Sequence, residues 1–491
     1  MIVMEAPPPV VFDVAVVGGG VMGAAAAYHA ARRGLSCALL ERYALGGHER
    51  GSSHGPSRIV RRTYPSTLYT TLMRRAYELW HEAEGERAAL GLGAAEGPLL
   101  ERGVGGGLDL CDASSRVLAE LRAACAAVGV PLETLDADAA HRRFGLRLRA
   151  SEVAVHQRDT CVAAASRCVA GFQLLARARG AALLGNAEVV SVEREAPGGG
   201  ALRPFAVATA DGRCVRARRV IVCPGPWAAP LLERLFGLRL RLQVWQCTTA
   251  FFERRPAPAD TGRCQSAVEP LPVLIDYGER PLWARRQGGD DGAAPGPVAD
   301  ASSSSATSAA AAAAGGALAD DDELAQPIYS CPCIGEPGRA KFAIHRGVDT
   351  TADDRSFEPT LALLAPVQAW LRKRLPDFDA EAPLDASTCL YTMTADEDFV
   401  IDALDGDEAG VIVACGFSGH GFKFAPVIGA LLAAMASAGA EGAEGAAGGD
   451  SAVAGAVAEA LGPGVDAAEV ARAFSLKRAA LQVASGALND A

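Results

Sequence analysis

The sequence predicts an α/β protein in which a Rossmann-like nucleotide-binding domain is assembled from separate pieces of the chain, with a second domain inserted between them. Three short apolar strands, far apart in the chain, predict this architecture: 14–17, 219–222 and 411–414. Each strand runs into a glycine- or proline-containing turn and then a helix, as in doubly wound folds. The length of 491 residues is enough for about three domains.

The N-terminal unit reads VAVVGGGVMGAAAAYHAARRGLSCALLER, residues 14–42. A strand at Val14–Val17, apolar on both faces, precedes a helix over Met22–Arg33, which Gly34 ends. A second apolar strand follows at Cys37–Leu40. Strand, helix and strand at this spacing predict a βαβ unit of a parallel sheet.

A dinucleotide-binding fingerprint lies in this unit, since Gly18-x-Gly20-x-x-Gly23 follows the strand and opens the helix. Gly18 would make the turn, Gly20 would let the backbone approach a pyrophosphate, and Gly23 would permit close helix–strand packing. Glu41 ends the second strand, where a carboxylate can accept hydrogen bonds from ribose hydroxyls. A lone GxGxxG is weak evidence and also occurs as a structural glycine turn, but strands, helix and acid in register favour a cofactor. The unit does not distinguish FAD from NAD; its N-terminal position in a long chain favours FAD.

Composition and charge argue against several kinds of partner. The net charge is −11, with 58 acidic and 47 basic residues, so we expect neither nucleic acid nor an anionic membrane as the main partner. The 13 cysteines are scattered, and the close pair Cys331 and Cys333 lacks the second pair or histidine cluster of a zinc site. We expect no metal, and reduced cysteines in an intracellular protein.

Several segments bear on targeting and order. The N-terminus lacks the basic start and apolar run of a secretory signal, and the end, Asn-Asp-Ala, is no Ser-Lys-Leu-type peroxisomal address. The uncharged stretch 425–440 is short and rich in alanine and glycine, which predicts a buried helix rather than a membrane span. The low-complexity segments 285–326 and 438–462 contain almost no large apolar residue, so we expect disordered surface insertions without chemistry.

Three stretches combine reactive or charged side chains with small residues. They are GSSHGPSRIVRRTYPSTLY (51–69) with His54, Arg58 and Arg61, STCLYTMTADEDFVID (387–402) with Cys389, and VIVACGFSGHGFKFAP (411–426) with Gly416, Gly419, Gly421 and Lys423. Taken alone, such arginines are typical of a solvated basic turn, a lone cysteine of a small buried hydrophobe, and a lysine of the solvated surface. Glycine lets backbone approach a ligand closely, so the glycine-dense loop predicts a ligand site.

The sequence resembles the monomeric sarcosine oxidase and pipecolate oxidase family in three motifs, which follow GxGxxG in this order: GSSHGPSRIVRRTY, CLYTMTADEDFVID and CGFSGHGFKFAP. These proteins are amine-oxidising flavoproteins of the D-amino-acid-oxidase-like fold. The resemblance spans about 11–437 without the low-complexity insertion, and it implies an inserted α+β substrate domain built on a mixed sheet. The form GFKFAPVIG is closer to the pipecolate branch.

The resemblance implies roles on the flavin side of the site. Cys389 matches the cysteine that forms a thioether to the flavin 8-methyl carbon, so FAD would be covalently held. His54 and Arg58 match residues packed beside the flavin ring, and Lys341 matches a lysine above flavin N5 that activates dioxygen. The glycines of 416–421 would let backbone lie against the ring.

Other residues match the substrate side. Arg61 and Lys423 match the pair that holds the substrate carboxylate, a charge-assisted geometry suited to arginine. His345 matches a histidine that lines the amine pocket, and Tyr391 follows the flavinylated cysteine into the same site. His420 would brace the loop, and the helix from Ala425 would direct its N-terminal dipole at the reduced flavin.

One position departs from the family pattern. A tyrosine that lines the family's substrate site precedes the Lys341 strand, and the alignment of IYSCPCIG places Ser330 there. Tyr329, one position away, would then face the other side of a strand. Serine in place of a ring leaves extra room, so we expect a cyclic amine such as L-pipecolate to be preferred to sarcosine.

The expected activity is FAD-dependent oxidation of the secondary amine of an N-substituted or cyclic amino acid, L-pipecolate or sarcosine, to an imine, with O₂ reduced to H₂O₂. The alternatives are a flavin-dependent amine dehydrogenase with a non-oxygen acceptor, against which Lys341 argues, and a non-catalytic flavin-binding protein. We expect a monomer whose partners are a small amino-acid substrate and O₂, in the cytoplasm or, by family analogy, in the peroxisome.

The predicted domains follow from these assignments. The FAD-binding domain would comprise 11–92, 150–235 and 396–475, the substrate domain 93–149 and 236–395, and the two low-complexity insertions 285–326 and 438–462.

Overall fold

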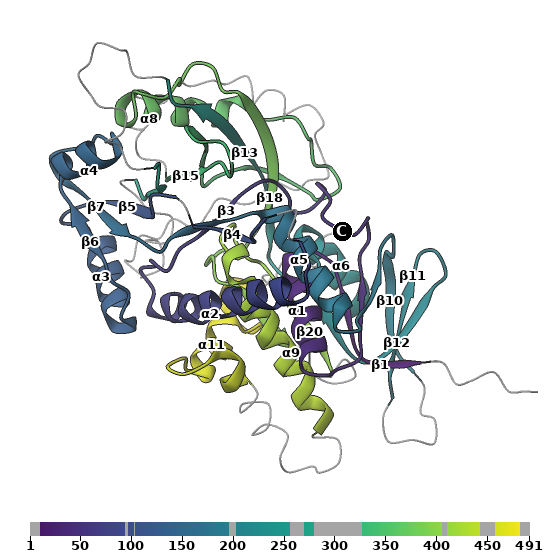
Figure 1. Ribbon diagram of the computed structural model, residues 1–491. Helices are drawn as coiled ribbons and strands as arrows, with labels where there is room; N and C mark the ends of the chain where they lie inside the picture. The colour runs from purple at the N-terminus through teal and green to yellow at the C-terminus, as the bar shows by residue number, and fades with distance from the viewer. Residues whose placement is uncertain are drawn as a thin grey trace, which may run out of the picture.

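The computed structural model describes residues 10–93, 97–102, 104–195, 203–255, 270–278, 327–404, 410–441 and 457–481. Two large sheets organise this part of the chain (Figure 1). Strands β1, β10, β11 and β12 of the first sheet lie at the lower right of the view. Strands β5, β7, β13 and β18 of the second lie in its upper part.

The first sheet places the three predicted strands side by side. Strand β1 pairs in parallel with β12 and β2, and β12 pairs in parallel with β20. In spatial order the strands are β10 (Val189–Arg194), β11 (Phe205–Thr209), β12 (Cys214–Val222), β1 (Val11–Val17), β2 (Cys37–Leu40) and β9 (Ala182–Leu184), with β20 (Val411–Cys415) on β12 and β19 (Val400–Ala403) on β20. The prediction of a Rossmann-like sheet assembled from distant strands is confirmed.

Small side chains let the helices over this sheet pack closely. A Cβ on Gly429 of α9 would lie 2.6 Å from the carbonyl carbon of Ala25 in α1, so the two alanine-rich helices touch through their backbones. The helices of this part are α1 (Val21–Arg32), α2 (Thr67–Ala89), α5 (Ala165–Ala178), α6 (Ala228–Phe236), α9 (Ala425–Glu441) and α11 (Ala467–Phe474), with short 3₁₀ helices at Gly225–Trp227, Phe422–Phe424 and Ala479–Leu481. In the part of the chain that the structure describes, no helix is long and apolar enough to cross a membrane.

The second sheet is mixed, as predicted, because β14 runs parallel to β5 while the other pairs are antiparallel. In spatial order its strands are β17 (Val348–Thr350), β13 (Gln243–Glu253), β16 (Arg339–Ile344), β15 (Ile328–Pro332), β14 (Val273–Asp276), β5 (Gly107–Asp112), β7 (Glu152–Gln157) and β6 (Glu133–Leu135), with β18 (Asp385–Met393) on β13. The helices α3 (Arg116–Val128), α4 (Ala137–Phe144) and α8 (Ala365–Arg374) and a 3₁₀ turn at Leu361–Leu363 belong to this part. A third, small sheet joins β3 (Arg58–Val60), β8 (Cys161–Ala163) and β4 (Leu100–Glu101).

Two boundaries differ from the sequence-based prediction. Strand β7 pairs with β5 in the second sheet, although it falls inside 150–235, so the boundary of the FAD-binding domain belongs after β7. The insertion predicted at 438–462 is too wide, because 438–441 complete helix α9 and Leu461 is buried in the core. Alanine has a high helix propensity, which explains why helix α9 continues to 441, beyond the predicted start of the insertion at 438. The insertion at 285–326 lies outside the described residues.

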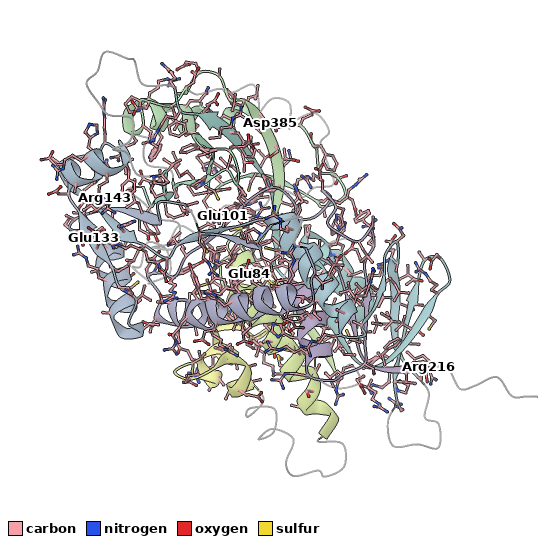
Figure 2. The ribbon with its side chains drawn as sticks, viewed as in Figure 1. Glu84, Glu101, Glu133, Arg143, Arg216 and Asp385 are labelled. Atoms are coloured by element: carbon pink, nitrogen blue, oxygen red, sulfur yellow. The ribbon has the colours of Figure 1, made fainter. Side chains whose placement is uncertain are left out.

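Several charged residues lie at the periphery of the molecule. Figure 2 shows Glu133, Arg143, Arg216 and Asp385 near its edges. Arg143 and Glu133 form an ion pair 3.0 Å long, beside β6 and α4. Such partly exposed pairs contribute little to stability.

Candidate active site

Two cavities adjoin each other in the described structure. The first, of about 420 Å³, opens at the N-terminus of α1, and the second, of about 540 Å³, lies against the second sheet. Arg58, Tyr391, Gly419 and Phe422 line both. A ligand that fills the first cavity therefore reaches the edge of the second.

The glycine fingerprint shapes the first cavity. Gly18 has φ of +100°, and a Cβ there would lie 2.2 Å from the carbonyl oxygen of Cys223. A Cβ on Gly23 would lie 1.8 Å from the oxygen of Gly18, so both positions require glycine. Gly20 is the N-cap of α1 and lines the cavity. Because glycine has no side chain, Gly20 does not cap the first amide groups of the helix.

Glu41 is buried at the edge of this cavity, and the protein fixes both of its oxygens. One accepts a hydrogen bond from the Gly19 amide at 2.6 Å, and the other accepts one from the Tyr43 amide at 2.9 Å. His48 Nε2 lies 3.1 Å from the second oxygen. The carboxylate, the open helix end and the close backbone approach fit the dinucleotide part of FAD.

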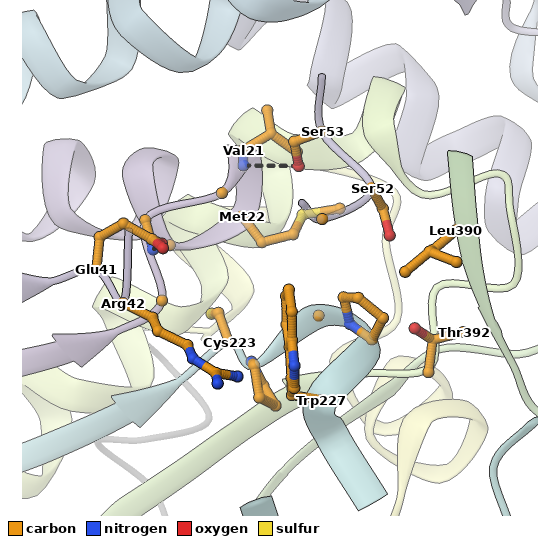
Figure 3. A pocket seen from close by; sticks show the side chains of 18 of the residues that line it. Val21, Met22, Glu41, Arg42, Ser52, Ser53, Cys223, Trp227, Leu390 and Thr392 are labelled. Carbon is orange, nitrogen blue, oxygen red and sulfur yellow. Dashed lines mark hydrogen bonds between the residues drawn. The ribbon is translucent and has the colours of Figure 1, made fainter. Parts of the chain in front are cut away.

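Beside the predicted Glu41, the first cavity is lined by residues that were not predicted, among them Arg42, Trp227, Leu390 and Thr392. Figure 3 shows Glu41 and Arg42 on one side and Leu390 and Thr392 on the other, with Trp227 below. The Arg42 guanidinium lies 5.5 Å from the centre of the Trp227 ring. The sequence signal for Trp227 was its place in the turn after the apolar strand 219–222, where Rossmann-like folds bind ligands.

The loop of 51–57 ties the helix end to the second sheet. Ser53 Oγ accepts a hydrogen bond from the Val21 amide at 3.1 Å, marked by a dashed line in Figure 3. At the other end of the loop, the Ser57 carbonyl accepts one from Lys341 Nζ at 2.7 Å. This loop thus spans the region where the two cavities meet.

One face of the second sheet supplies much of the second cavity. Tyr329 and Cys331 of β15, Lys341 of β16, and Cys389 and Tyr391 of β18 all line it. The spacing of two along each strand explains why these residues share a face. Cys331 lies opposite Lys341 in the antiparallel register, which fixes the alignment of β15 on β16.

The structure corrects the prediction for Ser330. Tyr329 lines the second cavity, and its hydroxyl lies 3.1 Å from that of Tyr391. Ser330 lies opposite Phe342, a core residue, and is fully buried, and its hydroxyl has no hydrogen-bond partner among the described residues. Directly opposed residues of an antiparallel pair share a face, so Ser330 points away from the cavity. The ring expected in the amine pocket is therefore present, and the argument for extra room is wrong.

Lys341 is a buried lysine, 5% exposed. Burial, and after it the nearby Arg58, lowers the pKa of Lys341 to about 8. The ammonium therefore carries its charge at neutral pH but loses it in a range where an ordinary lysine stays charged.

Cys389 is buried in β18 and lies directly opposite Cys247 of β13. A hydrogen bond from the Cys247 thiol lowers the pKa of Cys389, and the cations of Arg58, Lys341 and Arg355 act in the same direction. A thiolate is the nucleophilic form of cysteine, so this sulfur is the reactive one of the pair. Arg355, which the sequence did not single out, donates to the Thr388 carbonyl at 2.7 Å.

Arg58 lines both cavities, and His54 lines the second. The Arg58 guanidinium folds back on its own loop and donates to the carbonyls of Ser57 at 2.8 Å and His54 at 2.7 Å. Burial, followed by Arg58 and Arg355, lowers the pKa of His54 to about 3, so its imidazole is neutral at pH 7. The solvated-turn interpretation of Arg58 does not hold, since its guanidinium is tied to the loop.

Arg61 and Lys423 both lie near the ring of Tyr64 and line the second cavity with it. The Arg61 guanidinium carbon is 4.7 Å and Lys423 Nζ is 5.3 Å from the centre of the Tyr64 ring. Lys423 Nζ donates to the Tyr64 hydroxyl at 2.8 Å and to the His420 carbonyl at 2.6 Å. Burial, and then the charge of Arg61, lowers the pKa of Lys423 well below its ordinary value. Tyr64 was not predicted, although it is the last residue of the motif GSSHGPSRIVRRTY.

The amine side of the second cavity is crowded by rings. The imidazole of His345 lies 5.4 Å from the Tyr391 ring, centre to centre. A Cβ on Gly419, whose φ is +74°, would lie 2.5 Å from that ring, so this position of the loop requires glycine. Gly416 and Gly421 line the first cavity beside it. Burial, followed by Lys423 and Arg61, lowers the pKa of His345 to about 4.

The predicted site residues therefore gather around two adjoining cavities. Gly18, Gly20, Gly23, Glu41, Gly416 and Gly421 line the first, His54, Arg61, Lys341, His345, Cys389 and Lys423 line the second, and Arg58, Tyr391 and Gly419 line both. His420 links the loop to its surroundings, since Nε2 lies 3.0 Å from the Glu397 carbonyl. Among the described residues, no three or more His, Cys, Asp or Glu side chains are placed to hold a metal ion.

Comparison with known proteins gives concordant results. The family model described as FAD dependent oxidoreductase (DAO) matches residues 13–435. A protein of Arabidopsis thaliana named "Probable sarcosine oxidase" is 30% identical over 429 residues, covering 87% of this chain and 88% of that protein. The monomeric sarcosine oxidase of Streptomyces avermitilis is 30% identical over 440 residues, covering 87% and 94%. The solved structure of NikD, an amino acid oxidase, superposes with a TM-score of 0.63 at 22% identity, covering 87% of this chain and 93% of that one, and supports the fold alone.

Proposed function

The chain belongs to the FAD-dependent oxidoreductase family, and within it to the monomeric sarcosine oxidases, and we propose that this FAD-dependent amine oxidase converts an N-substituted or cyclic amino acid to its imine. Dioxygen takes up the two electrons and becomes hydrogen peroxide. The observation that carries the proposal is that two basic residues, the half-buried Arg61 and the buried Lys423, line a cavity that adjoins the cofactor cavity.

Bound FAD supplies the two-electron redox chemistry. Arg61 and Lys423 would bind the substrate carboxylate through charge-assisted hydrogen bonds. The amine would then lie toward Tyr391 and His345. Because its pKa is about 4, His345 is neutral near pH 7 and can accept a hydrogen bond from the amine without repelling a cation.

Lys341 would serve the oxygen half of the reaction. Its ammonium is buried and held by the Ser57 carbonyl, so it is fixed before the reaction begins. A preorganised cation stabilises negative charge as dioxygen is reduced. This role favours oxygen as the electron acceptor over a dehydrogenase acceptor.

We also propose that Cys389 is the site of covalent FAD attachment. In this step Cys389 loses its thiol hydrogen and forms a bond to the 8-methyl carbon, which also loses one hydrogen. The two electrons pass to the bound flavin and from there to dioxygen. The low pKa of the Cys389 thiol supports the assignment.

The test of the attachment is retention of colour. Acid-precipitated wild-type protein should stay yellow, with the flavin on the peptide that contains Cys389. Cys389→Ser should fold and bind FAD but give a colourless pellet. A colourless wild-type pellet from freshly flavinated protein would contradict covalent attachment at Cys389. It would not affect the proposal that the protein is an amine oxidase.

The substrate is a small secondary amino acid in this proposal. With Tyr329 lining the cavity, sarcosine and L-pipecolate both remain candidates. We further propose a monomer, as the name of the Streptomyces relative states for that protein, and a cytoplasmic or peroxisomal location.

The activity is tested with a panel of amines. L-Pipecolate, L-proline, sarcosine and N-methyl-L-tryptophan are mixed anaerobically with the yellow protein, and loss of flavin absorbance is followed before oxygen is admitted. At least one amine should bleach the flavin, and oxygen should restore the colour with stoichiometric hydrogen peroxide. Failure of every amine to bleach the flavin would overturn the proposed function.

A further inference from the structure

The guanidinium of Arg61 is held by the protein through one nitrogen. Nη1 donates to Asp109 Oδ1 at 2.8 Å, to the Tyr277 hydroxyl at 3.0 Å and to Thr63 Oγ1 at 3.1 Å. It also donates to the Thr63 carbonyl. Within the described residues, Nε and Nη2 make no hydrogen bond, although Arg61 lines the second cavity. Nε and Nη2 form one edge of the guanidinium plane, with two parallel N–H donors that match a carboxylate.

Asp109 is an unexpected residue in its strand. It lies in β5 between Leu108 and Leu110, both core residues, and is itself 2% exposed. A carboxylate taken out of water is costly unless it is paired and hydrogen-bonded. Asp109 is paired with Arg61 and Tyr277. The protein therefore buries this carboxylate, at a cost in desolvation free energy, next to the proposed binding site of the substrate carboxylate.

The sheet brings Tyr277 to the same point. Strand β14 runs parallel to β5, with Ile275 opposite Asp109, and Tyr277 follows directly after β14. The Tyr277 hydroxyl donates to Asp109 Oδ1 at 3.0 Å. Asp109 and Tyr277 are 168 positions apart, so only the fold makes them a pair.

The charges around Arg61 keep it ionised. Burial works against the charged form, but Tyr277 and Asp109 raise the pKa of Arg61 above its ordinary value. Burial raises the pKa of Asp109, and Arg61 opposes this effect. The ion pair thus keeps Arg61 charged and occupies Nη1, while Nε and Nη2 have no hydrogen bond among the described residues.

We propose that Asp109 and Tyr277 are positioning residues for Arg61: they fix Nη1 so that the Nε–Nη2 edge faces the cavity and receives the substrate carboxylate. The inference rests on the carboxylate-binding role proposed for Arg61. A different reading of the same contacts makes Asp109 a counter-charge that competes with the substrate. The two readings differ in sign, because losing a positioning residue weakens carboxylate binding and losing a competitor strengthens it.

The experiment measures carboxylate binding without turnover. Holoprotein is titrated with sodium acetate at constant ionic strength, and the dissociation constant is read from the change in flavin absorbance, with acetamide as the neutral control. Asp109→Asn keeps the shape and removes the charge, and we expect the acetate dissociation constant to rise about tenfold or more, as for loss of a hydrogen bond to a charged group. Tyr277→Phe should raise it about threefold. In turnover, both variants should raise KM more than they lower kcat.

Glu152→Gln is the matched control, since Glu152 is also a buried carboxylate of this sheet, paired with Arg374, but lines neither cavity. It should lower the melting temperature and leave acetate binding unchanged. Acetate binding to Asp109→Asn that is as tight as in the wild type, or tighter, would overturn the inference. If Asp109→Asn does not fold, an unchanged acetate constant in Tyr277→Phe would overturn it. The proposed function fails separately, in the amine panel, because acetate binding needs no oxidation.

Discussion

Cys247 on β13 lies directly opposite Cys389 on β18, and the hydrogen bond between their thiols makes Cys389 the more acidic of the two. Burial and the proximity of Cys389 raise the pKa of Cys247. The pair therefore separates into a proton donor and an incipient thiolate. The thiolate sits at the position proposed for flavin attachment.

Removal of the Cys247 thiol should slow covalent attachment of FAD at neutral pH. A lowered pKa means that the Cys389 thiolate exists above that pKa and is lost as pH falls through it, and Cys247→Ala raises this threshold toward an ordinary thiol. We expect attachment to apoprotein at pH 7 to slow by about an order of magnitude, since a lost hydrogen bond to a charged group is worth about 1.5 kcal/mol or more. At pH 9 to 9.5 the difference should shrink. The measurement is acid-stable flavin against time after FAD is added.

Cys37→Ala is the control for this prediction, because Cys37 is buried on β2 and lines neither cavity. It should attach FAD at the wild-type rate. Equal rates for Cys247→Ala and wild type at pH 7 would show that the Cys247 hydrogen bond does not activate Cys389.

Lys341→Met should separate the two half-reactions. Methionine keeps the length of the side chain and removes the charge, so amine should still reduce the flavin at a comparable rate. Reoxidation by O₂ should slow ~10²–10³-fold, the typical loss for one preorganised electrostatic group. Stopped-flow absorbance measures both steps, and Lys373→Met, on the exposed side of α8, is the control. Equal slowing of both steps would assign Lys341 to substrate binding or structure instead.

The reoxidation step should also depend on pH in a defined direction. The pKa of Lys341 is lowered to about 8 by burial and Arg58, so the cation is present below that pH and is lost above it. The wild-type reoxidation rate should therefore fall as pH rises from 7 to 9, with a midpoint near 8. Lys341→Met should be slow throughout and lack this step. A flat wild-type profile over this range would contradict the assignment.

The parts of the site that the sequence predicted belong to contiguous motifs. Gly18, Gly20 and Gly23 act within one turn, and their requirement for glycine is local. Cys389 and Lys423 lie in long motifs of the resembling family. The roles of such residues can be predicted from sequence because the residues of one motif also lie close together in the site.

The parts that could not be predicted depend on pairing between distant strands. Asp109 is a single polar residue in an apolar strand, and only the pairing of β5 with β14 brings it to Tyr277. Tyr329 and Ser330 differ by one position, and a one-residue shift in a strand exchanges its faces. An alignment without the strand register could not decide which of the two faces the cavity. The boundary before β7 failed for the same reason, since its sheet is known only from its partner β5.

The ring of Tyr329 should set the size of the amine that the enzyme accepts. Tyr329→Ala removes the ring and its hydroxyl contact with Tyr391, which opens space on the amine side of the cavity. We expect the ratio of kcat/KM for L-pipecolate to that for sarcosine to rise about tenfold, within the ~10–200-fold range that a few methylenes provide. Ser330→Ala is the matched control, because Ser330 is the neighbouring residue on the opposite face and its hydroxyl has no hydrogen-bond partner among the described residues. It should leave the ratio unchanged. A shift of the ratio in Ser330→Ala, with none in Tyr329→Ala, would reverse the assignment of the two faces of β15.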